Sequence, residues 1–392
     1  MIHPMADLLD RARKPDRVVV GLMSGTSADS IDAAVCRISG QGDAVGAELL
    51  HYREHPHDPE VRRAIIGLAD LGVRGVAELH ARIGEAFAEA TLVAIEAAGL
   101  SAADVDVIGS HGQTIYHHSG VAGATRATLQ LGDGDRIAVR TGCYVVSDFR
   151  ARDIAAGGEG APLLPIADVV LFRGGVAGRR RAILNLGGIA NLTVLGDDPS
   201  QTFGFDTGPA NAPLDRLARR ISGGALDCDR DGRIARAGQV DERLLAELLD
   251  RDPFPHRLPP KSTGFEMYGD EFVDRLAADW GGSHADLMAT LVELVARTVR
   301  IGVGQCAQLG GPVDELIAAG GGVRNPALMK RIAEAVAPIP VRRSDEVGVP
   351  YDAREAMAFA VLADMTLRGE PAILPPVTGA WAPKLLGKLS FP

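Results

Sequence analysis

Apolar residues along this chain fall into short runs that alternate with longer stretches of helical periodicity. The short runs predict strands at Val18–Met23, Ile31–Ile38, Val105–Ser110, Ala182–Leu186, Leu192–Leu195 and Glu315–Ala319. The periodic stretches predict helices at Val76–Ala98, Asp286–Gly302, Pro326–Ala337 and Ala353–Leu367. Strands that alternate with helices in this way indicate an α/β fold rather than an all-helical or all-strand one.

One strand–turn–strand pattern occurs twice in the sequence. The segment VVVGLMSGTSADSIDAAVCRI has a small, polar turn between two apolar strands, and RRAILNLGGIANLTVL repeats this order in the second half of the chain. A third glycine-rich segment runs from a strand through Gly320, Gly321 and Gly322 into a helix that Asn325-Pro326 is expected to begin. The repeat indicates two related halves, and DIAAGGEGAPLLP, rich in Gly and Pro, is the expected connector.

The composition narrows the class of protein. The chain has 392 residues, 46% of them apolar and 23% charged, which is typical of a soluble globular protein with two domains. A net charge of -10, with no basic stripe, argues against nucleic-acid binding. No apolar run approaches the roughly 20 residues that cross a bilayer. The N-terminal segment carries charges of both signs, and the four cysteines form no CxxC pair, so we expect a cytoplasmic protein without a zinc site.

The first hairpin tip offers groups that suit a phosphate. Gly25 can adopt unusual backbone angles, and the hydroxyl-bearing residues around it add donors beside exposed N–H groups. Asp29 and Asp32 could hold Mg²⁺, which prefers oxygen ligands. An ordinary hairpin turn also favours Gly, Ser and Asp, so both interpretations are open for this segment alone. No Walker motif occurs in the chain.

The second hairpin is followed by a candidate general base. TFGFDTGPANAPLDRL places Asp206 where an apolar strand meets Thr-Gly-Pro, and a carboxylate at a strand end of an α/β sheet commonly faces a ligand. Helix capping is the alternative for this residue. The segment PPKSTGFEMY could contact phosphate or cap a helix.

Two further segments carry polar groups that could bind a ligand or a metal. His111, His117 and His118 follow the expected strand Val105–Ser110, but no carboxylate or cysteine adjoins them, which disfavours zinc. LDCDRDGRIARAG matches the first half of a calcium loop, but Gly238 stands where a bidentate Glu is needed, so we expect a turn there.

Taken together, the motifs resemble a known family. From about residue 18 to the C-terminus the chain is similar to the anhydro-N-acetylmuramic acid kinases of the actin-like sugar kinase superfamily. The motifs that carry the resemblance are GLMSGTSADSID, HGQT, LQLGDGD, DFRARDIAAGGEGAPL, NLGGIANLT, FDTGPAN, PKSTG, AAGGGVRNPALM and VTGA. The resemblance implies two ribonuclease-H-like domains with the active site between them. We expect residues 1–150 and about 372–392 in the first domain and residues 151–371 in the second.

The resemblance also implies roles for individual residues. Asp206 matches the family's catalytic base. The implied ATP contacts are Gly25, Thr26, Ser27, Ala28, Asp29, Ser30, Ile31, Asp32, Gly187, Gly188, Gly320, Gly321, Gly322 and Asn325, with Asp29 and Asp32 as the Mg²⁺ carboxylates. The implied sugar or transition-state contacts are His111, Gln130, Arg150 and Glu355. A homodimer is also implied.

The implied reaction is an ATP-dependent ring opening. Asp206 takes a proton from a water that attacks the anomeric carbon of 1,6-anhydro-N-acetylmuramic acid, and O6 receives the γ-phosphoryl group. The product would be N-acetylmuramic acid 6-phosphate, an intermediate of cell-wall recycling. The chain departs from the family pattern at Ser30, Glu159 and Phe265. These departures bear on how the substrate is recognised rather than on phosphoryl transfer. The alternatives are a kinase of levoglucosan or another anhydrosugar, and a catalytically silent nucleotide-binding module.

Overall fold

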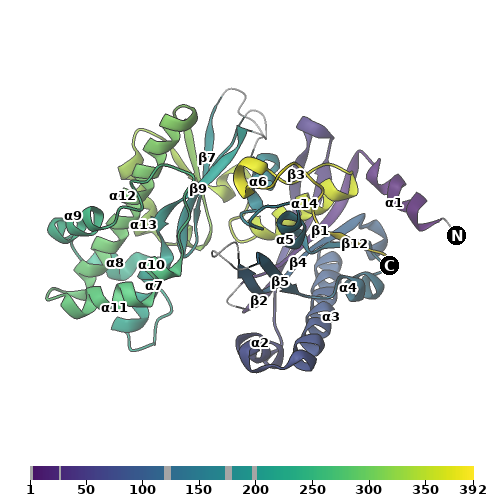
Figure 1. Cartoon of the computed structure of the whole chain (residues 1–392), viewed down its shortest axis with the longest axis horizontal. Coiled ribbons are helices and arrows are strands. Elements are labelled where there is room, and N and C mark those ends of the chain that lie inside the picture. The colour runs from purple at the N-terminus through teal and green to yellow at the C-terminus, as the bar shows by residue number, and fades with distance from the viewer. Residues whose placement is uncertain (1–2, 26–27, 119–124, 173–178, 197–200) are drawn as a thin grey trace. The chain divides into compact units, whose positions relative to one another are not determined.

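A computed structural model describes residues 3–25, 28–118, 125–172, 179–196 and 201–392. The chain forms two compact units (Figure 1). Unit 1 contains the chain up to Phe172 together with Ala353–Pro392, and unit 2 contains residues 179–196 and Phe203–Asp352. These limits differ from the expected ones: residues 151–172 and 353–371 belong to unit 1, because the helices that they form pack there.

Unit 1 is built around a seven-stranded sheet. Its strands are β1 (Asp16–Ser24), β2 (Ser30–Ser39), β3 (Gly46–Pro56), β4 (Val107–His118), β5 (Ala127–Leu131), β6 (Val145–Ser147) and β12 (Lys388–Ser390). Its helices are α1 (Pro4–Ala12), α2 (Pro59–Ile66), α3 (Val73–Ala97), α4 (Gly134–Thr141), α5 (Phe149–Ala155), α6 (Leu164–Phe172), α14 (Arg354–Leu367) and α15 (Pro375–Thr378).

Helices cover both faces of this sheet. Val20 and Leu22 of β1 lie in one hydrophobic cluster with Ile83 and Phe87 of α3. Because side chains alternate along a strand, Gly21 faces the opposite side, where a Cβ atom would collide with the backbone of α14 at Ala356. The glycine therefore allows α14 to lie directly on β1, and this contact joins the C-terminal part of the chain to the N-terminal sheet.

Unit 2 contains a five-stranded sheet. Its strands are β7 (Arg181–Leu186), β8 (Ile189–Val194), β9 (Phe203–Pro209), β10 (Glu315–Ala319) and β11 (Val341–Arg343). Its helices are α7 (Asn211–Ile221), α8 (Arg233–Ala237), α9 (Glu242–Arg251), α10 (Phe265–Tyr268), α11 (Asp270–Asp279), α12 (His284–Gly310) and α13 (Pro326–Val336). The long helix α12 packs on α13, on α8 and on the strand β9, and its buried residues form the centre of the core.

The two sheets share one topology. In unit 1 the strand order is β3-β2-β1-β4-β6, and in unit 2 it is β9-β8-β7-β10-β11. In each unit the first three strands are antiparallel neighbours, and the fourth and fifth run parallel to the first. A sheet with this order and these directions is ribonuclease-H-like, so the expected α/β class and the internal repeat are confirmed.

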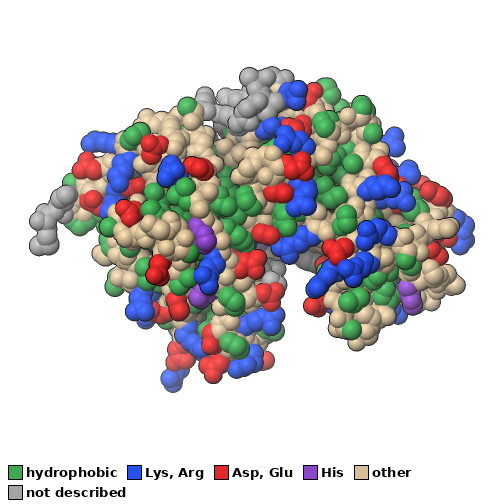
Figure 2. Space-filling model, turned by 180° about the vertical axis from the view of Figure 1, so that it is seen from behind, with side chains coloured by type: hydrophobic (Ala, Val, Ile, Leu, Met, Phe, Trp, Pro, Cys, Tyr) green, Lys and Arg blue, Asp and Glu red, His purple; other side chains and the backbone are tan. Residues whose placement is uncertain are grey.

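The expected elements can now be compared with the observed ones. Each of the six expected strands and four expected helices coincides with an element of the same type, with ends that differ by up to eight residues. One expectation was wrong: His111 and its neighbours lie inside β4, which continues to His118 because β5 pairs with its second half. No helix of the described residues is long and apolar enough to span a membrane. Figure 2 shows acidic and basic side chains interspersed on the visible face.

Candidate functional site

The turn between β7 and β8 contains the two glycines of the second hairpin. The N–H of Asn211 donates to the carbonyl of Gly187 at 2.9 Å, and that of Ala210 donates to Gly188 at 3.0 Å. The Asn211 side chain also donates to the carbonyl of Leu186 at 2.8 Å. These bonds tie the start of α7 to the hairpin, so the turn has a fixed conformation with a backbone that a ligand can approach.

The glycines at 320–322 lie against the same hairpin. Gly320 has φ of 83°, and a Cβ atom there would lie 3.0 Å from the carbonyl oxygen of Leu186. At Gly322 a Cβ atom would come within 2.6 Å of the Leu186 Cβ. Gly321 is more open. Asn325 follows, and its side-chain oxygen accepts hydrogen bonds from the first turn of α13, so it is the N-cap of that helix.

Asp206 lies in β9 beside the second hairpin. It pairs with Asn191 of β8, whereas Gly208 pairs with Ala190, so Thr207 is an extra residue in the strand. Such a bulge redirects side chains and is common beside active sites. Unit 2 therefore brings together three elements that the sequence singled out: the hairpin at Gly187 and Gly188, the Gly320–Gly322 segment and Asp206.

The PKSTG segment contacts the Asp206 carboxylate directly. Its Oδ2 atom accepts hydrogen bonds from the Ser262 hydroxyl at 3.0 Å and from the Thr263 N–H at 2.9 Å. Burial raises the pKa of Asp206, and these two bonds together with the charge of Lys261 oppose the rise. A carboxylate whose pKa is raised toward neutrality is a better general base than an ordinary exposed aspartate. Sequence reasoning did not connect PKSTG with Asp206.

The first loop of unit 1 is held by a buried polar network. The Ser24 hydroxyl, at the end of β1, lies 2.9 Å from His57 Nε2 and 2.7 Å from Gln113 Oε1, and it also contacts the carbonyl of Ser30 at 2.9 Å. The Gln113 amide donates to the carbonyl of Gly25 at 3.0 Å. The start of the loop is thereby fixed to β4, and its end at Ser30 is bonded to Ser24. Neither His57 nor Gln113 was predicted as a site residue.

Within this loop the predicted ATP contacts have different environments. Thr26 and Ser27 lie outside the described residues. Ala28 is buried with φ of 52°, and its N–H donates to the carbonyl of Gly25 at 3.1 Å, which closes a tight turn. Ile31 points into the hydrophobic cluster, so only its backbone is available to a ligand. Ser30, with its small side chain, begins β2.

The two predicted metal carboxylates are exposed to different degrees. Asp29 is exposed and forms an ion pair with Arg62 at 2.6 Å. Asp32 is half-buried and accepts a hydrogen bond from the Tyr52 hydroxyl at 2.9 Å. Mg²⁺ in phosphate sites uses one or two carboxylates together with waters and phosphate oxygens, and this pair provides such oxygen donors. Among the described residues no group of three or more His, Cys, Asp or Glu side chains forms a metal cluster.

His111, Arg150 and Glu355 form a second polar group in unit 1. Arg150 Nε donates to His111 Nε2 at 2.8 Å, which requires an unprotonated Nε2, and the proton on Nδ1 then faces the carbonyl of Gly112 at 3.0 Å. Burial and the Arg150 charge hold the pKa of His111 well below its usual range. Burial lowers the pKa of Arg150, and the charge of Glu355 opposes this. Both ring nitrogens of His111 are therefore occupied, which makes Arg150 the more direct candidate for a ligand contact.

Gln130 lies on β5 opposite Thr114 of β4. Its amide donates to the Thr128 hydroxyl at 2.8 Å, and the residue is buried. In this arrangement it stabilises the β4–β5 pair, and its predicted contact with the sugar stays a prediction.

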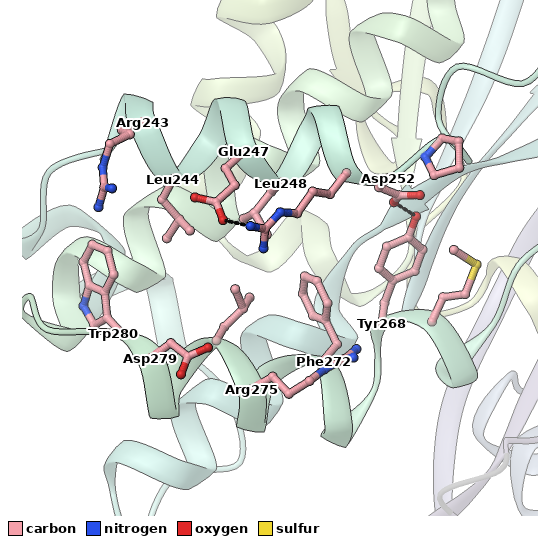
Figure 3. A pocket seen from close by; sticks show the side chains of 14 residues that line it. Arg243, Leu244, Glu247, Leu248, Asp252, Tyr268, Phe272, Arg275, Asp279 and Trp280 are labelled. Atoms are coloured by element: carbon pink, nitrogen blue, oxygen red, sulfur yellow. Dashed lines mark hydrogen bonds and ion pairs between the residues drawn. The ribbon is translucent and has the colours of Figure 1, made fainter.

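A pocket of about 620 Å³ lies between α9 and the α10–α11 segment (Figure 3). Leucine and aromatic side chains such as Leu248 and Phe272 line it, together with charged residues. None of the predicted site residues borders it. The Tyr268 hydroxyl donates to Asp252 at 2.5 Å at one end of the pocket, and this bond secures the chain segment that leads to PKSTG.

Two ribonuclease-H-like units in one chain, each with a small-residue hairpin at the start of its sheet, define the actin-like class that includes nucleotide-dependent sugar kinases. The model of the anhydro-N-acetylmuramic acid kinase family matches residues 17–392. The chain belongs to the anhydro-N-acetylmuramic acid kinase family, and it is therefore a member of a phosphotransferase family.

Individual relatives agree with this assignment, and each of the following is named anhydro-N-acetylmuramic acid kinase. The protein from Caldanaerobacter subterraneus subsp. tengcongensis is 41% identical, over 99% of this chain and 100% of the relative. That from Salinibacter ruber is 43% identical over the same shares of the two chains. That from Streptomyces coelicolor is 44% identical over 95% and 93%. A solved ROK hexokinase from Thermus thermophilus is more distant, with 17% identity, a TM-score of 0.39, and 88% of this chain and 99% of the hexokinase covered.

Proposed function

We propose that this protein is an ATP-dependent kinase that opens the internal ether of 1,6-anhydro-N-acetylmuramic acid and phosphorylates O6. The products are N-acetylmuramic acid 6-phosphate and ADP. The observation that carries the proposal is the half-buried Asp206 carboxylate beside the glycine hairpin of unit 2, within a chain that matches this kinase family over residues 17–392. Phosphoryl transfer to an existing hydroxyl does not require a base that activates water, whereas ring opening does.

The proposed chemistry assigns one proton transfer to Asp206. The carboxylate accepts a proton from water while the water oxygen bonds to the anomeric carbon and the bond between that carbon and O6 breaks. O6 then bonds to the γ-phosphorus as the bridging oxygen leaves with ADP, so that the reaction consumes one water and releases one proton. The raised pKa of Asp206 supports this role, because it strengthens the base near neutral pH.

Nucleotide binding is assigned to backbone rather than to charged side chains. In unit 2, Gly187, Gly188 and Gly320–Gly322 have no side chains of their own, and Gly320–Gly322 would face adenosine. In unit 1, the Ala28 N–H donates to the Gly25 carbonyl, and the first loop would contact the phosphates. Mg²⁺, when bound, neutralises phosphate charge, and Asp29 and Asp32 would hold it.

Recognition of the sugar is assigned to unit 1. Arg150 has a fixed guanidinium, since it donates to His111 at 2.8 Å and to the carbonyl of Gly160 at 2.9 Å. A guanidinium suits a carboxylate such as that of the lactyl group. Glu355 and Gln130 offer acceptors and donors for hydroxyl and amide groups.

The test is an ADP-release assay with three sugars. We expect turnover with 1,6-anhydro-N-acetylmuramic acid, and a product with the mass of N-acetylmuramic acid 6-phosphate. Levoglucosan lacks the lactyl and N-acetyl groups and should be a poor substrate, and ordinary N-acetylmuramic acid has no 1,6-anhydro bond to open. A strong preference for levoglucosan, or absence of ADP release with the anhydromuramic sugar, would contradict the proposal.

A further inference from the structure

The loop between α9 and α10, residues 252–264, contacts Asp206 through its last residues. Hydrogen bonds hold the rest of the loop at several points. At its start, Asp252 accepts hydrogen bonds from the Phe254 N–H at 2.9 Å and from the Tyr268 hydroxyl at 2.5 Å. The second bond joins the start of the loop to the end of α10, as Figure 3 shows. The segment that carries the Asp206 contacts is therefore held between Asp252 and Tyr268.

Helix α12 holds the middle of this loop. The buried Gln305 amide donates to the carbonyl of Pro255 and to that of Arg257, each at 2.9 Å. Lys261 reaches back along the loop and donates to the Pro255 carbonyl at 2.8 Å, while its ammonium lies 5.1 Å from the ring centre of Phe254. These contacts connect the loop to the core of unit 2, so it is positioned by the most extensively buried helix of that unit.

The last residues of the loop bond to one of the two carboxylate oxygens of Asp206. The Asp206 N–H donates to the carbonyl of Lys261 at 3.3 Å, and Ser262 and Thr263 both donate to Oδ2. Among the described residues, none donates a hydrogen bond to Oδ1. Two donors on one carboxylate oxygen fix the rotation of the carboxylate group. They also stabilise the negative charge on that oxygen.

We propose that Ser262 and Thr263 are positioning residues that hold Oδ2 of Asp206 so that Oδ1 is the atom which accepts the proton from water. The inference rests on the proposed function for the identity of the water, but the orientation of the carboxylate does not depend on the substrate. The proton on Oδ1 passes to solvent after the ring has opened, which restores the base.

Charged neighbours provide a way to test this. Lys261 lowers the pKa of Asp206 and Glu266 raises it, and burial is the largest influence. The loss of the Ser262 donor should raise the pKa of Asp206, because a bond to the charged form is removed, whereas Glu266→Gln should lower it. Burial holds the pKa of Lys261 itself to about 8, so experiments should stay below pH 7, where this lysine is charged.

The experiment compares Ser262→Ala, Ser262→Thr and Glu266→Gln with the wild type in two measurements. The first is a ¹³C-carboxyl NMR titration of the free enzyme, with the Asp206 signal assigned by its loss in Asp206→Asn. The second is the pH profile of kcat. We expect Ser262→Ala to shift the Asp206 titration and the acidic limb of kcat to higher pH, with kcat about tenfold lower on the plateau. Ser262→Thr should restore both, and Glu266→Gln should shift the titration to lower pH.

If Ser262 only supported the fold, Ser262→Ala would not move the Asp206 titration in the direction opposite to Glu266→Gln. The inference is wrong if Ser262→Ala leaves the midpoint of the Asp206 titration unchanged and kcat within twofold of the wild type. It is also wrong if Ser262→Ala and Glu266→Gln shift that midpoint in the same direction. Failure of the proposed function is a separate result: wild-type protein without activity on the anhydrosugar would leave the NMR titration, and with it the orientation of Asp206, unaffected.

Discussion

The ring-opening step of the proposed reaction depends on the carboxylate of Asp206. Asp206→Asn keeps the shape of the side chain but removes its basicity. We expect kcat to fall by about 10²–10⁴ or more, since general-base catalysis contributes on this scale, while ATP binding is unchanged. An ADP-release assay and a nucleotide titration measure the two quantities. A variant within tenfold of wild-type kcat would remove Asp206 from the mechanism.

His111 makes the stability of unit 1 depend on pH. Its folded-state pKa is well below 6.5, because of burial and of Arg150, whereas an unfolded histidine titrates near 6.5. The unfolded state therefore binds more protons below about pH 6.5, and the free energy of unfolding decreases as the pH falls through that range, by up to about 1.4 kcal/mol per pH unit for one group.

We predict that His111→Asn reduces this dependence. Urea denaturation between pH 5 and 7.5 should show a smaller change in unfolding free energy for the variant than for the wild type, whatever its absolute stability. His57, whose pKa burial also lowers, contributes with the same sign, so His57→Asn is the matched comparison. An identical pH dependence in His111→Asn and the wild type would show that His111 is not held neutral.

At the scale of elements, the contact between the 3₁₀ turn Gly321–Arg324 and the β7–β8 hairpin depends on the absence of a side chain. In Gly322→Ala, the new methyl group would lie 2.6 Å from the Leu186 Cβ and 3.0 Å from Asn211 Oδ1, so the turn must move away from the hairpin. We expect a loss of about 1–3 kcal/mol of stability and at least tenfold weaker ATP binding.

The matched control for this substitution is Gly304→Ala. Gly304 is an exposed residue of α12, and a Cβ atom there meets nothing within 4 Å, so alanine should stabilise the helix by roughly 0.5–1 kcal/mol and leave ATP binding unchanged. Thermal denaturation and isothermal titration with ATP distinguish the two variants. Equal ATP affinity in Gly322→Ala and the wild type would contradict a nucleotide contact at this turn.

Sequence patterns predicted six strands and four long helices, and they missed several other elements, including the apolar helix α6. β3 is only half-buried and carries residues such as Glu48, Tyr52 and Arg53, so its periodicity is weak. Helices α7 and α9 were also not predicted, although both are amphipathic. Candidate site residues were found where a motif marks them, as at Asp206, but the contact with Ser262 joins residues 56 positions apart and has no local signal.

At the scale of the whole molecule, the two units have equivalent sheets, and the proposed function assigns residues to both of them. Kinases built from two domains commonly close on their ligands. We predict that an ATP analogue and the anhydrosugar together reduce the radius of gyration measured by small-angle X-ray scattering. Each ligand alone is the control, and an unchanged radius with both ligands would exclude closure.

The position of α14 has a consequence for the order in which the protein matures. Gly21 of β1 lies against Ala356, and Arg17 of the same strand forms a buried ion pair with Asp364, so the first strand to be synthesised is completed by one of the last helices. The ribosome must synthesise all of unit 2 and then α14 before unit 1 can acquire its native packing, because α14 follows unit 2 in the sequence. Newly made chains should therefore present the uncovered face of the first sheet to chaperones until α14 has left the ribosome.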